Sequence, residues 1–196
     1  SRRFPVVYDP MKVSPELLQI ASATKQETYV FFGGRAERDV PTFVKIVKMM
    51  PDVKFVCVVD AKMVTDEMKR LSNLLVKTNV SLTEFNTDLA RASYCLIPLK
   101  SKAPCGLLVM QRAAMLGVPI ISTETYSMRT VVPDDNYGFL SPRGDADAMA
   151  DKLRLLMSDE TLRQRIADKA RQRMTMFSHE AVGRQMAEAA QYVMAQ

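Results

Sequence analysis

Residues 99–123 read L-K-S-K-A-P-C-G-L-L-V-M-Q-R-A-A-M-L-G-V-P-I-I-S-T. A loop ending at Gly106 leads into the apolar run 107–116, which predicts a helix, and residues 118–122 predict a short strand. Gly117 suits the left-handed residue that often ends a helix. The first amide N–H groups of such a helix lack partners within the helix, so they suit a phosphate or another anion. We therefore expect function in the loop that precedes this helix.

The rest of the chain alternates between strand-like and helix-like segments. Extended apolar runs predict strands at residues 5–8, 28–32, 53–59, 80–82, 94–99 and 139–140. Apolar residues at helical spacing predict helices at residues 14–21, 39–50, 63–75 and 87–91, and three more between residue 149 and the C-terminus. This alternation predicts an α/β fold, a Rossmann-like parallel sheet with helices on both faces and a helical C-terminus.

Four sequence features fall where predicted strands end. They are the glycine–arginine segment 33–39, Asp60, the predicted loop 83–86 and the loop 100–106. Ligands of parallel α/β sheets bind beyond the carboxyl ends of the strands. Glycines let backbone approach a ligand closely, and a guanidinium binds phosphate oxygens. A diphosphate site is one interpretation, and a tight turn with solvated arginines is the other.

Composition narrows the classes of protein. The chain has 196 residues and a formal net charge of +5, which mildly favours anionic partners without the basic arm typical of nucleic-acid binding. Cys57, Cys95 and Cys105 lack the spacing of metal ligands. The sequence contains no P-loop, no G-x-S-x-G and no H-E-x-x-H, so it gives no support for an NTPase, a hydrolase triad or a metallopeptidase. No apolar run reaches the ~18 residues of a membrane span, and we expect a cytoplasmic protein.

Three segments resemble a known family. They are G-G-R-A-E-R-D at 33–39, G-L-L-V-M-Q-R-A-A-M-L-G-V-P-I-I-S-T at 106–123 and V-V-P-D-D-N-Y-G-F-L-S-P-R-G-D-A-D-A-M-A-D-K-L at 131–153. All three are similar to the C-terminal, donor-binding half of retaining glycosyltransferases of the GT-B fold. The resemblance implies that residues 1–196 form one nucleotide-sugar-binding domain taken from a two-domain enzyme whose N-terminal acceptor domain is absent.

The resemblance also implies a site. The base of the nucleotide is expected near Thr83, Glu84 and Phe85, and its diphosphate near the segment 33–39 and the start of the helix. The full set of donor-binding residues that we expect is Gly33, Gly34, Arg35, Arg38, Thr83, Glu84, Phe85, Lys100, Gly106, Leu107, Leu108, Gln111 and Arg112. No residue is assigned to catalysis, and no metal and no cofactor are expected.

The implied substrate is a UDP- or GDP-sugar. The implied partner is an acceptor glycan or lipid-linked glycan, bound through the missing N-terminal domain, in polysaccharide or glycan biosynthesis. In the full-length protein this places the enzyme in the cytoplasm, with the inner face of a membrane as a second option. The domain alone is expected to be inactive.

The sequence departs from the family at two acidic positions. The family has two glutamates eight residues apart, one near the donor sugar and one at the ribose. Here Ala103 or Pro104 occupies the first position, and Gln111 or Arg112 the second, because the register is shifted by one. Gln111 could still donate to or accept from ribose hydroxyls.

Other interpretations remain open from the residues. One is a non-catalytic binding or regulatory module of the same fold, in which the last helix docks a partner through a poorly covered face containing Val182, Met186 and Val193. A second is a dinucleotide-dependent oxidoreductase domain, since Gly33-Gly34 and Asp60 end successive strands; the missing third glycine argues against it. A phospho-receiver domain, suggested by Asp60 and Lys100, lacks the required acidic pair.

Overall fold

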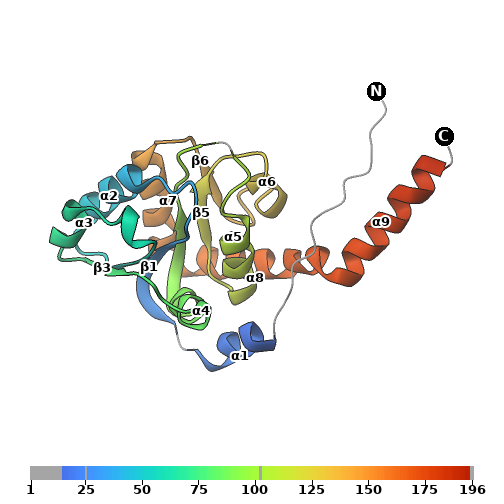
Figure 1. Cartoon of the computed structure of the whole chain (residues 1–196), viewed down its shortest axis with the longest axis horizontal. Coiled ribbons are helices and arrows are strands. Elements are labelled where there is room, and N and C mark those ends of the chain that lie inside the picture. The colour runs from blue at the N-terminus through green and yellow to red at the C-terminus, as the bar shows by residue number, and fades with distance from the viewer. Residues whose placement is uncertain (1–14, 25, 102, 195–196) are drawn as a thin grey trace.

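The structure is a computed structural model that describes residues 15–24, 26–101 and 103–194; the predicted strand 5–8, the predicted helix cap Ser14 and Lys102 lie outside the described residues. A six-stranded sheet forms the centre (Figure 1). Its strands are β1 (Glu27–Gly33), β2 (Phe55–Val58), β3 (Leu74–Lys77), β4 (Ala92–Ile97), β5 (Ile120–Thr123) and β6 (Phe139–Ser141). Every pairing is parallel, in the order β3-β2-β1-β4-β5-β6. The predicted parallel sheet is confirmed.

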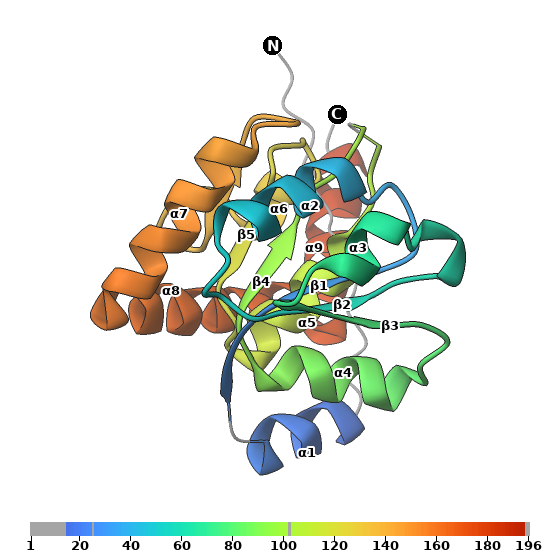
Figure 2. The same ribbon diagram turned by 90° about the vertical axis from the view of Figure 1, so that its left-hand side faces the viewer.

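Helices cover both faces of this sheet (Figure 2). Their bounds are α1 (Pro15–Ala23), α2 (Val40–Met49), α3 (Asp66–Arg70), α4 (Leu82–Arg91), α5 (Leu107–Leu116), α6 (Met128–Val131), α7 (Ala146–Ser158), α8 (Glu160–Arg173) and α9 (His179–Met194), with 3-10 turns η1 (Ala61–Met63) and η2 (Met174–Phe177). One apolar core joins the sheet to α1, α4 and α5, and a second joins it to α2, α3 and α7. The sheet is thus buried on both faces, as its continuous apolar strands require.

Local sequence signals explain the helix boundaries. The carboxylate of Asp39 accepts from the amide of Thr42 at 3.0 Å and so caps α2. Gly117 ends α5 with a φ of +70°, the left-handed conformation expected of a glycine there. Pro15 stands at the start of α1 and Ser178 caps α9 by accepting from the amide of Ala181. The predicted helix 107–116 has the same bounds in the structure.

Three predictions between residues 63 and 91 are wrong. The predicted helix 63–75 stops at Arg70, and Leu74 and Leu75 belong to strand β3. Asn73 explains the break, since its side-chain amide donates to the carbonyls of Val47, Met50 and Val53 and fixes the start of β3 beside β2. The predicted strand 80–82 and loop 83–86 are instead the approach to α4 and its first turns. Thr83, Glu84 and Phe85 are therefore helical.

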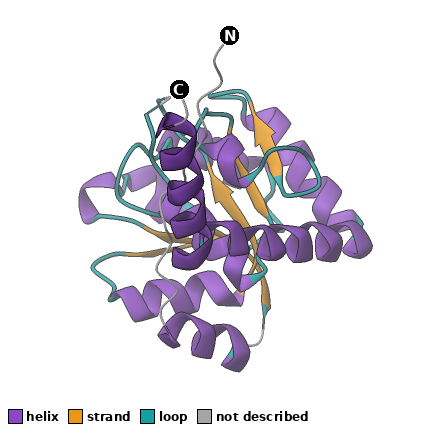
Figure 3. Cartoon of the chain, turned by 90° about the vertical axis from the view of Figure 1, so that its right-hand side faces the viewer, coloured by secondary structure: helices purple, strands orange, loops and turns teal. Residues whose placement is uncertain are grey.

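The last helix, α9, extends away from the sheet (Figure 1) and crosses the molecule's flank in a second view (Figure 3). Val182 is buried at its base. Met186 is 59% exposed, Val193 61% and Met194 80%. The prediction of a poorly covered apolar face is therefore confirmed for Met186 and Val193 and wrong for Val182.

Candidate functional site

A cavity of about 690 Å³ opens at the carboxyl edge of the sheet. Its walls come from four places in the chain: the loop after β1, the end of β2, the first turns of α4, and the loop and first turns of α5. These segments are far apart in sequence and meet because parallel strands end at the same edge. The cavity thus lies where the strand order predicts a ligand.

Arg38 organises the loop after β1. Its side chain is only 5% exposed, and it reaches back so that Nε donates to the carbonyl of Gly33 at 2.7 Å and Nη1 to that of Ala36 at 3.0 Å. Gly34 has a φ of +124°, and a Cβ at this position would overlap the Arg38 guanidinium. Glycine is therefore required at residue 34 both by conformation and by space. The loop is folded tightly around a buried cation.

The same loop is fastened to the segment that follows β4. The amide of Asp39 donates to the carbonyl of Pro98, and the amide of Lys100 donates to that of Glu37, both at 3.0 Å. Arg38 and Leu99 form an isolated antiparallel bridge. Two loops that are some sixty residues apart in sequence are therefore held as one unit at the mouth of the cavity.

Helix α5 points its N-terminus into this region. Its N-cap, Gly106, has a φ of +81° and no side chain to accept from the first amides. A Cβ on Gly106 would lie 3.3 Å from Nη1 of Arg38, so the buried guanidinium lies beside the start of α5. The positive end of the helix dipole and an arginine thus face one place in the cavity, an arrangement that favours an anion.

Three arginines and one carboxylate line the cavity. Arg35 is 83% exposed at its side chain and lies 3.5 Å from Asp60, measured between Nε and Oδ1. Arg38 and Arg112 have no carboxylate partner among the described residues, and burial lowers the pKa of both guanidinium groups. Two of the three lining arginines therefore keep a charge that no described acid neutralises.

Apolar side chains also line the cavity. Val80 lies just before α4, and Leu82 and Phe85 belong to its first turns. The ring of Phe85 packs edge-on against Phe31 at 5.2 Å between centroids, which fixes its orientation. The cavity lining therefore combines cationic and apolar groups.

The structure divides the predicted site residues into two groups. Those that line the cavity are Gly34, Arg35, Arg38, Phe85, Gly106, Leu107, Leu108 and Arg112. Those absent from its lining are Gly33, Thr83, Glu84, Lys100 and Gln111. Sequence reasoning missed Asn79, Val80 and Ser81, which line the wall just before α4; the apolar run there was read as a strand.

The five outlying residues have other contacts. Gly33 accepts from Arg38 through its carbonyl. Thr83 donates to Glu16, and Glu84 lies 3.4 Å from the ammonium of Lys77. Lys100 lies 3.8 Å from Glu37. Gln111 is 3% exposed, so it is Arg112, its neighbour, that α5 turns toward the cavity.

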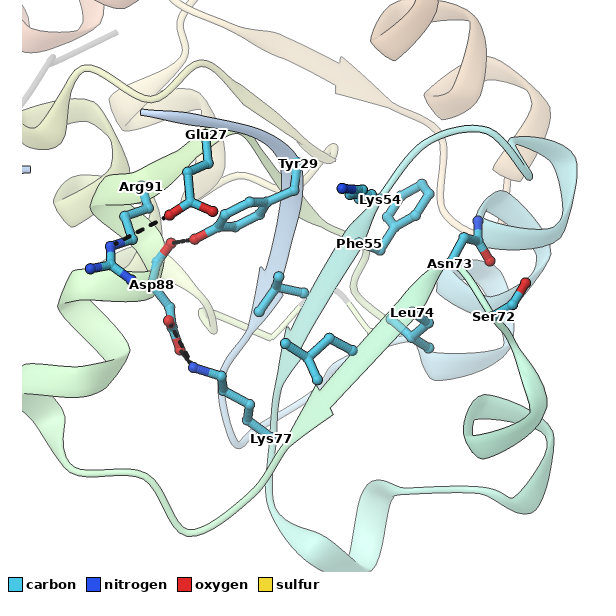
Figure 4. Close-up of a pocket in the computed structure, with 12 residues that line it drawn as sticks. Glu27, Tyr29, Lys54, Phe55, Ser72, Asn73, Leu74, Lys77, Asp88 and Arg91 are labelled. Carbon is cyan, nitrogen blue, oxygen red and sulfur yellow. Dashed lines mark hydrogen bonds and ion pairs between the residues drawn. The ribbon is translucent and has the colours of Figure 1, made fainter. Parts of the chain in front are cut away.

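A second cavity, of about 470 Å³, is lined in part by the first residues of β1, β2 and β3 (Figure 4). Apart from Lys54, for which no ion pair is found among the described residues, its charged groups are paired with one another. Lys77 Nζ lies 2.9 Å from the Asp88 carboxylate, Arg91 lies 3.7 Å from Glu27, and the hydroxyl of Tyr29 donates to the carbonyl of Asp88. The carboxyl-edge cavity thus has two lining cations, Arg38 and Arg112, without an acidic partner among the described residues, and the second cavity has one, Lys54.

Within the described ranges, no group of three or more His, Cys, Asp or Glu side chains is arranged to hold a metal ion. Among the same residues, no helix has the length and apolarity needed to cross a membrane.

A parallel sheet covered on both faces, with a cationic cavity at its carboxyl edge, defines a Rossmann-like α/β domain. Residues 14–173 match the family Glycosyl transferases group 1, and the chain belongs to this family. It is 27% identical over 141 residues to N-acetyl-alpha-D-glucosaminyl L-malate synthase of Bacillus anthracis, an alignment that covers 70% of this chain and 36% of that protein.

Solved structures show the same fold. Anabaena HepE in complex with UDP and glucose superposes with a TM-score of 0.75 at 16% identity, over 94% of this chain and 56% of that one. The C-terminal domain of the group 1 glycosyl transferase LpcC from Francisella tularensis gives a TM-score of 0.64 at 17% identity, over 87% of this chain and 95% of that one. The chain therefore spans about a third of the curated relative and about half of HepE, and it matches nearly all of an isolated C-terminal domain. The predicted Rossmann-like half of a GT-B fold is confirmed.

Proposed function

We propose that this chain is the donor-binding domain of a two-domain glycosyltransferase and that it binds a nucleoside diphosphate sugar in the carboxyl-edge cavity. The observation that carries the proposal is the convergence of buried Arg38 and the uncapped N-terminus of α5 at one end of that cavity. Membership of the group 1 family and the likeness to HepE, which was crystallised with UDP and glucose, support it.

The lining of the cavity contains groups that suit both the diphosphate and the base of a nucleotide. The diphosphate accepts from Arg38, from Arg35 and from the first amides of α5, while the base packs on Val80 and Phe85. Transfer of the sugar leaves extra negative charge on the diphosphate. Guanidinium groups and helix amides that are already in place stabilise this charge, because they need no reorganisation during the reaction. In this proposal no metal ion is required.

The proposal places the acceptor and part of the chemistry outside this chain. Asp60 is the single carboxylate among the described residues that line the cavity, and it already faces Arg35. The acceptor, a glycan or lipid-linked glycan, would bind on a second domain, and the domain alone would be inactive. We propose that the whole enzyme acts in polysaccharide or glycan biosynthesis.

Calorimetric titration in metal-free buffer tests the proposal, with UDP, GDP, ADP and NAD as probes. We expect one nucleoside diphosphate to bind and Arg35→Ala to weaken its binding by about 1.5–2 kcal/mol, the lower part of the range for hydrogen bonds to charged groups, because Arg35 is exposed. Arg143→Gln is the matched control, since Arg143 is exposed at the same edge but does not line the cavity. Binding of NAD alone would favour an oxidoreductase, and binding of none of the four would favour a non-catalytic interaction module.

A further inference from the structure

Arg112 differs from most arginines of the molecule in having no partner. It lies in the second turn of α5, half-buried in the cavity wall. No ion pair or hydrogen bond joins its guanidinium to any residue in the described part of the chain, whereas Arg91, Arg129 and Arg184 each face a glutamate. A partly desolvated cation without a partner costs free energy, and an anionic ligand would offset that cost.

Arg112 lines the same cavity as Arg38. Long side chains on a helix lean toward its N-terminus and lie over the preceding turn. For Arg112 the preceding turn holds Leu108, which also lines the cavity, and the start of that helix lies beside Arg38. Arg38 and Arg112 therefore line one cavity from two different elements.

The charges of the cavity match a diphosphate. Arg35 and Asp60 offset each other, so Arg38 and Arg112 supply the uncompensated positive charge of the lining. The diphosphate bridge of a nucleotide sugar carries about two negative charges, and the free nucleoside diphosphate carries more because its terminal phosphate is a monoester. The positive charge of the lining thus balances the negative charge of the nucleotide sugar, and it attracts the more highly charged nucleoside diphosphate more strongly.

We propose that Arg112 is a third guanidinium ligand of the diphosphate, acting with Arg38 and the N-terminus of α5. This inference rests on the proposed function and deepens it. The resemblance had implied a group that binds the nucleotide ribose at Gln111 or Arg112. The structure buries Gln111 and presents a cation that only donates hydrogen bonds.

A series of ligands that differ in phosphate number separates this role from a contact to the nucleoside. The affinities of UDP, UMP and uridine are measured calorimetrically for the unaltered chain, for Arg112→Gln, for Arg112→Lys and for the control Arg143→Gln. If the base is guanine, GDP, GMP and guanosine replace them. Thermal unfolding of each variant checks that the fold is retained.

We expect Arg112→Gln to weaken UDP about tenfold or more, UMP less, and uridine not at all, because the lost interaction is charge-assisted. Arg112→Lys should recover part of the affinity for UDP, and the dependence of affinity on salt should be shallower for Arg112→Gln. An equal loss for all three ligands would assign Arg112 to the nucleoside and overturn the inference. Unchanged UDP affinity of Arg112→Gln would overturn this inference and leave the proposed function intact. If the unaltered chain bound neither UDP nor GDP, both the inference and the proposed function would be overturned.

Discussion

Replacement of Gly106 by alanine tests how the start of α5 is built. Gly106 has a φ of +81°, and a Cβ there would lie 2.9 Å from Cε of Met128 and 3.3 Å from Nη1 of Arg38. The left-handed conformation costs an alanine about 1–2 kcal/mol, and displacing the two side chains adds roughly 0.5–1.5 kcal/mol. Alanine also restricts the unfolded chain more than glycine does, which raises the free energy of unfolding by about 0.4–1 kcal/mol. We expect a net loss of about 2 kcal/mol.

Alanine substitutions at two other glycines separate the cost of backbone strain from the cost of displacing side chains. Gly144 also has a positive φ, +76°, but no atom lies within 4 Å of its Cβ position, so Gly144→Ala should report backbone strain alone, about 1 kcal/mol. Gly183 lies in α9 with neither strain nor neighbours, and Gly183→Ala should stabilise the helix by about 0.5–1 kcal/mol.

Urea and thermal unfolding followed by circular dichroism measure the three variants. For a chain of this size, about 2 kcal/mol corresponds to a fall in Tm of roughly 4–8 °C. The reasoning would be refuted if Gly106→Ala unfolded at the same temperature as Gly183→Ala. If Gly106→Ala matched Gly144→Ala instead, the contacts with Met128 and Arg38 would carry no cost.

Three further predictions concern thiols and the last helix. In the native chain a thiol reagent such as DTNB should label Cys105, which lines the cavity, and leave buried Cys57 and Cys95 unreacted. A bound nucleoside diphosphate should slow the labelling of Cys105. Rapid labelling of a second thiol would contradict this prediction. Burial raises the pKa of Cys57 and Cys95 to about 12. In the unfolded chain these thiols have the ordinary pKa of about 8.5, so they lose their protons at a lower pH than in the folded chain. The free energy of unfolding is therefore unaffected by these thiols below about pH 8.5 and falls as the pH rises toward 12. Denaturant titrations over this pH range should show a smaller fall for Cys95→Ala than for the unaltered chain. An equal fall for the two proteins would contradict the prediction. Amides near Met186 in α9 should exchange with deuterium well before those of α5, because that face is uncovered; equal protection of the two helices in a monomer would argue that α9 is stabilised elsewhere.

Much of the fold follows from local sequence. The buried strands are continuous apolar runs, and Asp39 and Gly117 mark helix ends through their own conformational preferences. Residues 71–82 could not be read in this way. Leu71, Leu74 and Leu75 have helical spacing, but the three hydrogen bonds of Asn73 reach carbonyls 20 to 26 residues earlier in the chain, and a local pattern carries no trace of them.

The candidate site was predictable as a place but not as a set of contacts. Glycines and arginines at strand ends pointed to the edge of the sheet at which the 690 Å³ cavity opens. The sequence could not decide between Gln111 and Arg112, because the choice depends on how α5 is rotated against the sheet. It also could not show that Arg38 is buried and Arg35 exposed, since both arginines lie in the same short loop after Gly34.

The fastening of the loop after β1 to the segment after β4 has a consequence for synthesis of the chain. The amide of Asp39 finds its acceptor at Pro98, and the other wall of the cavity ends at Arg112. A growing chain that has released β1, β2 and β3 from the ribosome therefore has half a cavity and an unpaired edge on β1. The group of Arg38, Arg112 and the N-terminus of α5 is complete only after β4 and α5 have emerged. A nucleotide that binds this group therefore cannot assist the early steps of folding and can stabilise only a domain that is already assembled.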